Sequence, residues 1–256
     1  MTRRSTIVLG SALGISAGVL ALTLSLSTQS AAQAVIDTQP TPILTYPTYP
    51  PTPTLEPAPA PGASVAAALF TSSFDNVKDL ASFTPADLDF VTSETKGQWA
   101  VSDGSLFQDG TVSNGNPSMH PVALFANDLS LSDLSVQASF YNSSNGTAGL
   151  ITHRNGDTYY RYDIIADYYS DTPKQMLVKV QDGLETVLAS VDAPGFESYR
   201  WYTMEMTVQG GQIRVTLDGQ EVLQAVDKTP LAAGSVGLYS RAFGGMRFDN
   251  LIIAQP

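Results

Sequence analysis

The chain has 256 residues and no cysteine, which excludes disulfide bonds, thiolate metal sites, a cysteine nucleophile and a lipidated cysteine. Its formal net charge is −11. Residues 1–34 hold only two charged side chains, Arg3 and Arg4, so the rest of the chain has 11 basic and 24 acidic residues and a net charge of −13. Such a surface repels the phosphates of nucleic acids and of anionic lipids, so we expect no nucleic-acid partner.

Residues 1–34 are predicted to be an export signal. Arg3 and Arg4 precede an uncharged stretch over residues 7–26, and residues 32–34 (AQA) fit a small-x-small cleavage site. The uncharged stretch is also about long enough to cross a bilayer, so a retained membrane anchor is the alternative. Both alternatives place the rest of the chain outside the cytoplasm, secreted or at the cell surface, with membrane contact only through this segment.

A proline-rich spacer is predicted over residues 35–65. Nine of the 16 prolines lie between Pro40 and Pro61, interleaved with Thr, Tyr and Ala. Proline fixes φ and removes a backbone donor, so we expect an extended polyproline II segment without a core. At roughly 3 Å per residue, such a segment would hold the following domain away from a membrane or wall.

Residues 66–256 are predicted to form one all-β domain. Apolar and polar residues alternate with a period of two, for example in residues 134–141, 175–181 and 212–217, which is typical of antiparallel strands. Asp-Gly, Asn-Gly and Gly-Gly pairs separate about a dozen such segments. Only residues 76–82 and 85–89 suggest short helical turns. So many strands favour a two-sheet antiparallel jelly-roll sandwich.

The order of the later strands resembles a known superfamily. The pattern consists of residues 149–162 (GLITHRNGDTYYRY), 201–208 (WYTMEMTV), 211–219 (GQIRVTLDG), 234–240 (GSVGLYS) and 248–251 (FDNL). Over roughly residues 69–254 the chain resembles the concanavalin A-like lectin/glucanase sandwiches, which include laminin-G-type modules and 3-keto-disaccharide hydrolase relatives. This resemblance implies the sandwich fold, but the architecture hosts both binding proteins and enzymes.

The hairpin over residues 149–163 is the predicted ligand-binding element. Tyrosines would stack on sugar rings, and charged side chains would bond to sugar hydroxyls. The alternative is that these residues only suit a sheet surface and pair across strands. A histidine here could also serve as a base or metal ligand, as could His120, although neither has a partner at ligand spacing. The candidate ligand-binding residues are His153, Arg154, Tyr160, Arg161, Tyr162 and Asp163.

Two Phe-Asp-Asn triplets, at residues 74–76 and 248–250, suggest a metal site. In many jelly-roll sandwiches the first and last strands lie side by side, and a structural calcium ion bridges oxygens there. Asp75 and Asp249 are therefore the predicted ligands of a calcium ion, which prefers hard oxygen ligands. The alternative is that Asp249 and Asn250 only bond backbone groups at a turn.

Catalytic motifs are missing from the sequence. The Glu-x-Asp-x-x-Glu strand of family sixteen glucanases is absent, as are a Gly-x-Ser-x-Gly elbow and a His-Glu-x-x-His pair. We therefore expect an exported carbohydrate-binding, lectin-like protein displayed on the spacer. The alternatives are a glycoside-processing enzyme of the 3-keto-disaccharide hydrolase type, with Arg154, Tyr162 or Asp163 near the reaction, and a structural adhesion module without a small ligand.

Overall fold

The structure, a computed structural model, describes residues 55, 57–58, 68–88, 98–108, 111–113, 116–118, 121–143, 146–168, 170–242 and 245–256. The predicted export signal, most of the predicted spacer and His120 lie outside the described residues. Within the described part of the chain, no helix is long and apolar enough to span a membrane.

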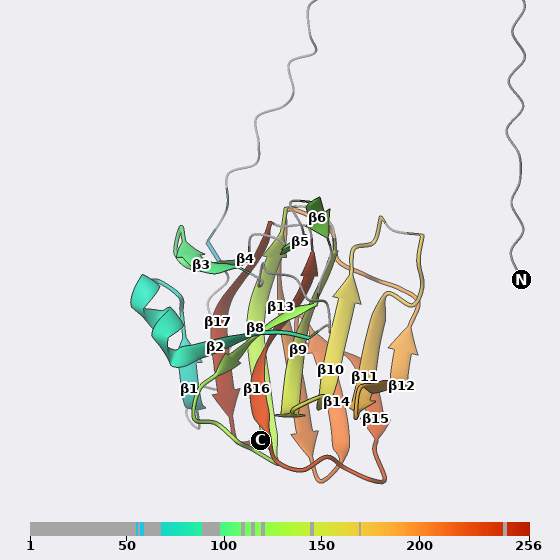
Figure 1. Ribbon diagram of the computed structural model, residues 1–256. Helices are drawn as coiled ribbons and strands as arrows, with labels where there is room; N and C mark the ends of the chain where they lie inside the picture. Colours follow the sequence, from blue (N-terminus) through green and yellow to red (C-terminus); the bar gives the residue numbers. More distant parts are fainter. Residues whose placement is uncertain are drawn as a thin grey trace, which may run out of the picture. The chain divides into compact units, whose positions relative to one another are not determined.

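Two antiparallel sheets stack on each other, as predicted (Figure 1). One sheet runs in the order β15 (Gln220–Val226), β14 (Gln212–Leu217), β13 (Trp201–Gln209), β8 (Leu134–Asn142), β17 (Met246–Ala254), β4 (Ser105–Gln108) and β3 (Trp99–Ser102), and β1 (Ala68–Ser72) also pairs with β17. The other runs in the order β12 (Leu184–Val191), β11 (Gln175–Gln181), β10 (Thr158–Ile165), β9 (Gly146–Asn155), β16 (Ser235–Ala242), β7 (Val122–Ala126) and β2 (Phe83–Asp87). A separate hairpin consists of β5 (Thr111–Ser113) and β6 (Asn116–Ser118).

The alternating pattern forms the core between the two sheets. In β8, every second residue from Leu134 to Phe140 is fully buried, and Ile213 and Val215 of β14 are buried in the same cluster. The seven-stranded sheet contributes Leu150 and Leu238 from the opposite side. Because side chains alternate across a strand, the polar residues between these positions face outward. The all-β sandwich prediction is confirmed.

The first and last strands lie side by side, as the two Phe-Asp-Asn triplets suggested. β1 pairs with β17 in antiparallel register, with Thr71 opposite Ile252 and Ser72 opposite Leu251. Phe74 and Phe248 are both fully buried in the common core. This pairing joins the start of the domain to its end within the eight-stranded sheet.

One of the two predicted helical turns is confirmed and the other is wrong. The 3₁₀ helix η1 (Val77–Ser82) begins after Asn76, whose side chain accepts a hydrogen bond from the Lys78 amide at 3.0 Å. Residues 85–87, predicted as helical, belong to strand β2 instead. Pro85 fits this strand because β2 is at the edge of its sheet, where a missing backbone donor is tolerated.

The outer face of the seven-stranded sheet also carries buried apolar side chains. In β11, Leu177 belongs to the core between the sheets, and Lys179 lies on the same side, opposite Tyr160 of β10. Val178 and Val180 belong to a second buried cluster on the other side. That cluster also contains Ala123, Phe125, Ile151, Tyr159 and Tyr239. We call this outer side the groove face, because two pockets lie on it.

Candidate functional site

Strand β10 divides the predicted ligand-binding residues between the core and the groove face. Tyr160 and Tyr162 are fully buried in the core cluster between the sheets. Arg161 and Asp163 alternate with them and line a pocket on the groove face. Alternation alone does not tell which side of a strand faces a groove, and the structure places Arg161 and Asp163 on this side.

Tyr160 closes a hydrogen-bond network at one end of the sandwich. Its hydroxyl donates to Asp227 Oδ2 at 2.7 Å and accepts from the Leu231 amide at 3.0 Å. Lys179 Nζ lies 2.7 Å from the same Asp227 oxygen. Burial raises the pKa of Asp227, but the bonds from Lys179 and Tyr160 outweigh it and hold this pKa below its usual value. Tyr160 therefore fixes residues 227–231 and has no exposed ring face for a sugar.

Tyr162 and His153 also have structural partners. The Tyr162 hydroxyl donates to Gln175 Oε1 at 2.7 Å. His153 is 1% exposed, its Nε2 lies 2.9 Å from the Ser132 carbonyl oxygen, and its ring contacts Tyr160 edge-on. Burial lowers the pKa of His153, which favours the neutral imidazole. We therefore leave both side chains, like Tyr160, out of the site proposed below.

Arg161, Asp163 and Glu185 form a connected charge cluster on the groove face. Arg161 Nε lies 2.8 and 2.9 Å from the two oxygens of Asp163, and its Nη1 lies 2.8 Å from Glu185 Oε1. The side chains of Arg161 and Asp163 are only 10% and 5% exposed, whereas that of Glu185 is 56% exposed. The Arg161 guanidinium also lies over the Tyr239 ring, 5.2 Å from its centre.

The electrostatics of Asp163 differ from those of a surface carboxylate. Burial raises the pKa of Asp163 to about 6, and the Arg161 guanidinium opposes this rise. Burial likewise raises the pKa of Tyr239, and the negative charge of Asp163 adds to this rise. A buried carboxyl group with a pKa near neutrality, at the wall of a pocket, has the properties of a proton acceptor or of a ligand-orienting group.

Glycine opens the space between Asp163 and Tyr239. In the ladder, Asp163 lies opposite Gly149, and Gly149 lies opposite Tyr239 on the next strand. A Cβ atom at Gly149 would clash with the Tyr162 carbonyl oxygen and lie 3.0 Å from Tyr239 Cδ1. Only glycine at position 149 therefore lets β9 lie between β10 and β16 in this register, with Asp163 on one side and Tyr239 on the other.

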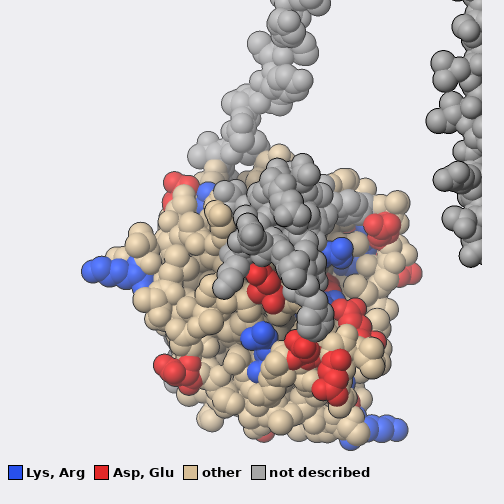
Figure 2. Space-filling model, viewed as in Figure 1, with Lys and Arg blue, Asp and Glu red and all other residues tan. Residues whose placement is uncertain are grey.

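These side chains line a pocket of about 330 Å³. It is bounded by residues of β9, β10, β11, β12 and β16 together with one residue before β7: Pro121, Thr147, Arg161, Asp163, Ile165, Met176, Glu185, Tyr239 and Arg241. Acidic and basic side chains also lie side by side on the face seen in Figure 2. The combination of apolar walls with a few convergent polar groups is typical of small-molecule sites.

Three charged or aromatic residues of this site were not predicted from the sequence: Glu185, Tyr239 and Arg241. Each comes from a strand other than the predicted hairpin, and sheet register alone brings it to Arg161 and Asp163. Glu185 had only the signal of an isolated acidic residue on a strand, and the alternation of residues 234–240 did not distinguish Tyr239 from a core residue.

The predicted calcium ligands lie near each other in a different pocket. Asp75, Asp103 and Asp249 line a space of about 520 Å³ with Trp201. Burial raises the pKa of Asp249 to about 6, and Asp75 adds to this rise although the Asn250 amide opposes it. A cation would relieve this repulsion, but no three acidic or histidine side chains in the described part of the chain converge as metal ligands. Backbone or water oxygens would have to complete the set, and calcium stays a prediction.

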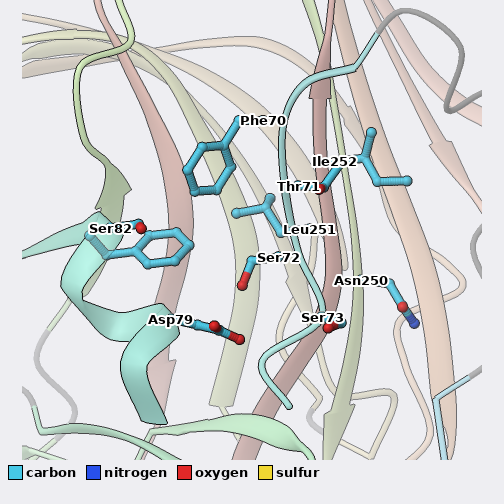
Figure 3. Close-up of a pocket in the computed structure, with 10 residues that line it drawn as sticks. Phe70, Thr71, Ser72, Ser73, Asp79, Ser82, Asn250, Leu251 and Ile252 are labelled. Atoms are coloured by element: carbon cyan, nitrogen blue, oxygen red, sulfur yellow. The ribbon is translucent and has the colours of Figure 1, made fainter. Parts of the chain in front are cut away.

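Another pocket, of about 350 Å³, lies where η1 meets β1 and β17 (Figure 3). Phe70 and Leu251 provide apolar wall, and the polar side chains of Ser72, Asp79 and Asn250 also line the pocket. This space is separate from the charge cluster, and none of the predicted ligand-binding residues lines it.

Comparisons with known proteins agree with this architecture. A family model described as a 3-keto-alpha-glucoside-1,2-lyase-like domain matches residues 69–254. A Bacillus subtilis protein of unknown function with a galectin-like fold has a TM-score of 0.59 at 14% identity, covering 74% of this chain and 96% of its own. The carbohydrate-binding module CBM66 of Bacillus subtilis has a TM-score of 0.52 at 17% identity, covering 68% of this chain and 96% of its own.

An enzyme has the same fold. The Bacillus licheniformis beta-glucanase has a TM-score of 0.52 at 13% identity, covering 75% of this chain and 99% of its own. At such identities the likeness shows the sandwich alone, and binding modules and enzymes share it. A search of curated proteins finds no match.

Proposed function

Because this chain belongs to the 3-keto-alpha-glucoside-1,2-lyase-like domain family, we propose that its groove face binds a carbohydrate. The observation that supports this most is the cluster of Arg161, Asp163 and Glu185 in the wall of a pocket. Carboxylate and guanidinium groups give the directed hydrogen bonds that sugar hydroxyls need, and the Tyr239 ring adds apolar contact.

The experiment is retention on immobilised α-glucosides, scored together with the melting temperature. Asp163→Asn keeps the size of the side chain but removes its charge, and Arg161→Met removes the donor fork, so both variants should lose retention. The matched control is Arg214→Met, which removes an arginine from an ion pair 2.9 Å long on the eight-stranded sheet. Full retention by both groove variants would reject the site, and loss of retention by Arg214→Met would show that the assay reports general charge.

A second candidate function is an elimination reaction, which the raised pKa of Asp163 favours. In a 3-keto-glucoside the ketone acidifies the C2–H bond. The Asp163 carboxylate would accept that proton, the C–H electrons would form the C1=C2 double bond, and the C1–O bond would break with its electrons moving to the leaving oxygen, which takes a proton from water. The adjacent guanidinium of Arg161 would stabilise the negative charge that develops on the ketone oxygen.

Turnover distinguishes the two candidates. If the protein is a lyase, 3-keto-α-glucosides should be cleaved to an unsaturated sugar, and the rate should rise with pH through an apparent pKa near 6 as Asp163 loses its proton. Asp163→Asn should then abolish cleavage. Absence of any unsaturated product, with binding retained, would leave carbohydrate binding as the function.

We further propose that the domain is exported and carried on the proline-rich spacer of residues 35–65. The basic start, the uncharged stretch and the cleavage site of residues 1–34 support export. N-terminal sequencing of the protein recovered from its host should find a start near Val35. A start at Met1 or Thr2 in the membrane fraction would favour the retained anchor.

A further inference from the structure

The end of the proline-rich spacer lies in a pocket of the sandwich domain. Leu55, Pro57 and Ala58 are described residues of the predicted spacer, and they line the same pocket of about 520 Å³ as the predicted calcium ligands. Leu55 and Ala58 are half-buried, and Pro57 is exposed. In an extended spacer that contacts no core, all three residues would be exposed. This contact was not predicted from the sequence.

The pocket lies on the outer face of the eight-stranded sheet. On β13, Tyr202 and Met204 belong to the core between the sheets, so Trp201 points outward. On β17, Phe248 belongs to the same core, so Asp249 also points outward. The groove face is the outer side of the other sheet. The spacer contact and the charge cluster of the groove face therefore lie on opposite faces of the sandwich.

Trp201 provides the aromatic surface of this pocket. Its ring packs against the ring of Tyr141, with the two centres 5.5 Å apart and the planes inclined by 43°. Tyr141 is buried, whereas Trp201 is half-buried and borders the pocket together with Leu55 and Pro57. Proline-rich segments bind such aromatic surfaces well, because their polyproline II backbone is already ordered and loses little entropy on binding.

Hydrogen bonds of the domain hold the turns beside the pocket. Ser73 Oγ donates to Asp75 Oδ2 at 2.7 Å. Arg247 Nη2 lies 3.1 Å from Asp103 Oδ2, and Arg247 Nη1 donates to the Ser102 carbonyl oxygen at 2.8 Å. These contacts do not involve the spacer. The domain therefore builds the pocket, and the end of the spacer only fills it.

The charges of the pocket exclude ion pairing as the source of this contact. Asp75, Asp103 and Asp249 line the pocket, and residues 35–67 contain no lysine or arginine. The apolar side chains of the spacer must therefore stabilise the contact. Weak contacts suffice, because the short connection to β1 keeps the spacer at a high effective concentration near the pocket.

We propose that this pocket, which we call the spacer dock, binds the end of the chain's own proline-rich spacer through Leu55 and Pro57. The spacer then leaves the domain on the side of the eight-stranded sheet, and the groove face points away from that side. The groove thus stays open to ligands when the spacer is attached to a membrane or wall. This inference concerns the attachment of the domain and does not depend on what the groove binds.

The test is fluorine NMR of the full chain labelled with 5-fluorotryptophan. The two tryptophans, Trp99 and Trp201, give one resonance each, and Trp99→Phe assigns them. Spectra are recorded with a chelator, so that the predicted calcium ion does not contribute. Leu55→Asp places a further carboxylate beside three others and should release the spacer. The Trp201 resonance should then shift, and its difference between H₂O and D₂O should increase as the ring becomes more exposed. The Trp99 resonance should stay unchanged.

Two variants make the result specific. Leu44→Asp is the matched control, because it makes the same change in the same spacer at a leucine outside the described residues, and it should leave both resonances unchanged. Leu55→Ala is a milder change and should shift the Trp201 resonance alone, in the same direction as Leu55→Asp.

Three outcomes would refute the spacer dock. They are a Trp201 resonance that is the same in the unaltered protein and in both Leu55 variants, an equal shift in Leu44→Asp, and a joint shift of both tryptophans in both Leu55 variants. The first outcome would mean that the spacer does not cover Trp201 and that the pocket is open to another partner. Sugar retention is not part of this measurement, so the spacer dock and the proposed carbohydrate binding can fail independently.

Discussion

Breaking and then replacing the Arg161–Asp163 pair separates a functional role from a structural one. Asp163→Leu leaves the buried Arg161 charge with Glu185 as its remaining carboxylate partner. Removing one partner of a buried pair costs about 3–5 kcal/mol. Because Glu185 still balances part of the charge, we expect the lower end of that range, about 3 kcal/mol, in the free energy of unfolding.

The opposite single variant adds a pH dependence. Arg161→Met leaves Asp163 buried without its cation, which raises further a pKa that already lies at about 6. The folded variant then binds a proton at Asp163 more tightly than the unfolded chain does. Protonation at low pH therefore raises the variant's free energy of unfolding. The destabilisation relative to the original protein should be large at pH 8, should shrink as the pH falls through this further raised pKa, and should level off below about pH 6, where Asp163 is protonated in both folded proteins.

The double variant, Arg161→Met with Asp163→Leu, decides the question. Replacing both members of a buried ion pair by apolar residues is often neutral or stabilising, so the free energy of unfolding should return to within about 1 kcal/mol of the value for the original protein. Urea titration measures these values, and for a chain of this size about 3 kcal/mol corresponds to about 6–12 °C in melting temperature. The double variant should nevertheless lose all retention on α-glucosides. If the double variant stays as unstable as Asp163→Leu, or still binds α-glucosides, the ion pair does not serve ligand binding and our reasoning is wrong.

Three further predictions concern stability away from the groove. Lys179→Met leaves the buried carboxylate of Asp227 without its cation, so it should lower the free energy of unfolding, measured by urea titration, by about 3 kcal/mol. Arg214→Met, in a half-exposed pair, should lower it by less than about 1 kcal/mol. Equal losses in the two variants would contradict the burial argument. Tyr160→Phe should cost about 1–3 kcal/mol without changing sugar retention, and a loss of retention at full stability would return this hydroxyl to the binding site. If calcium is bound, a chelator should lower the melting temperature by several degrees in the original protein but not in Asp249→Asn, and a flat response in both would remove the ion.

The fold was predictable because its signals are local. Alternation with a period of two is visible within single segments such as residues 134–141, and the Asp-Gly turns supply residues that adopt positive φ, as Asp218 and Gly219 do. The pairing of terminal strands followed from the resemblance to a known sandwich. The one wrong element, residues 85–87, shows the limit: proline is common both in a first helical turn and in an edge strand, and only the neighbouring strand β7 decides between them.

The site was only half predictable because its members converge through sheet register. Arg161 and Asp163 share a face by their spacing, so the sequence could pair them. It could not tell that this face is the outer one, since tyrosine suits both a buried and a ligand-facing position. The contribution of Tyr239 depends on two strand pairings and on the missing side chain of Gly149, which no local pattern reveals.

The most direct measurement is a crystal structure of the full chain soaked with maltose or its 3-keto derivative. Our account predicts a sugar ring within hydrogen-bond distance of Asp163 and Arg161. A sugar bound instead on the eight-stranded sheet or in the pocket between η1 and β17, with the groove face empty at saturating ligand, would contradict it.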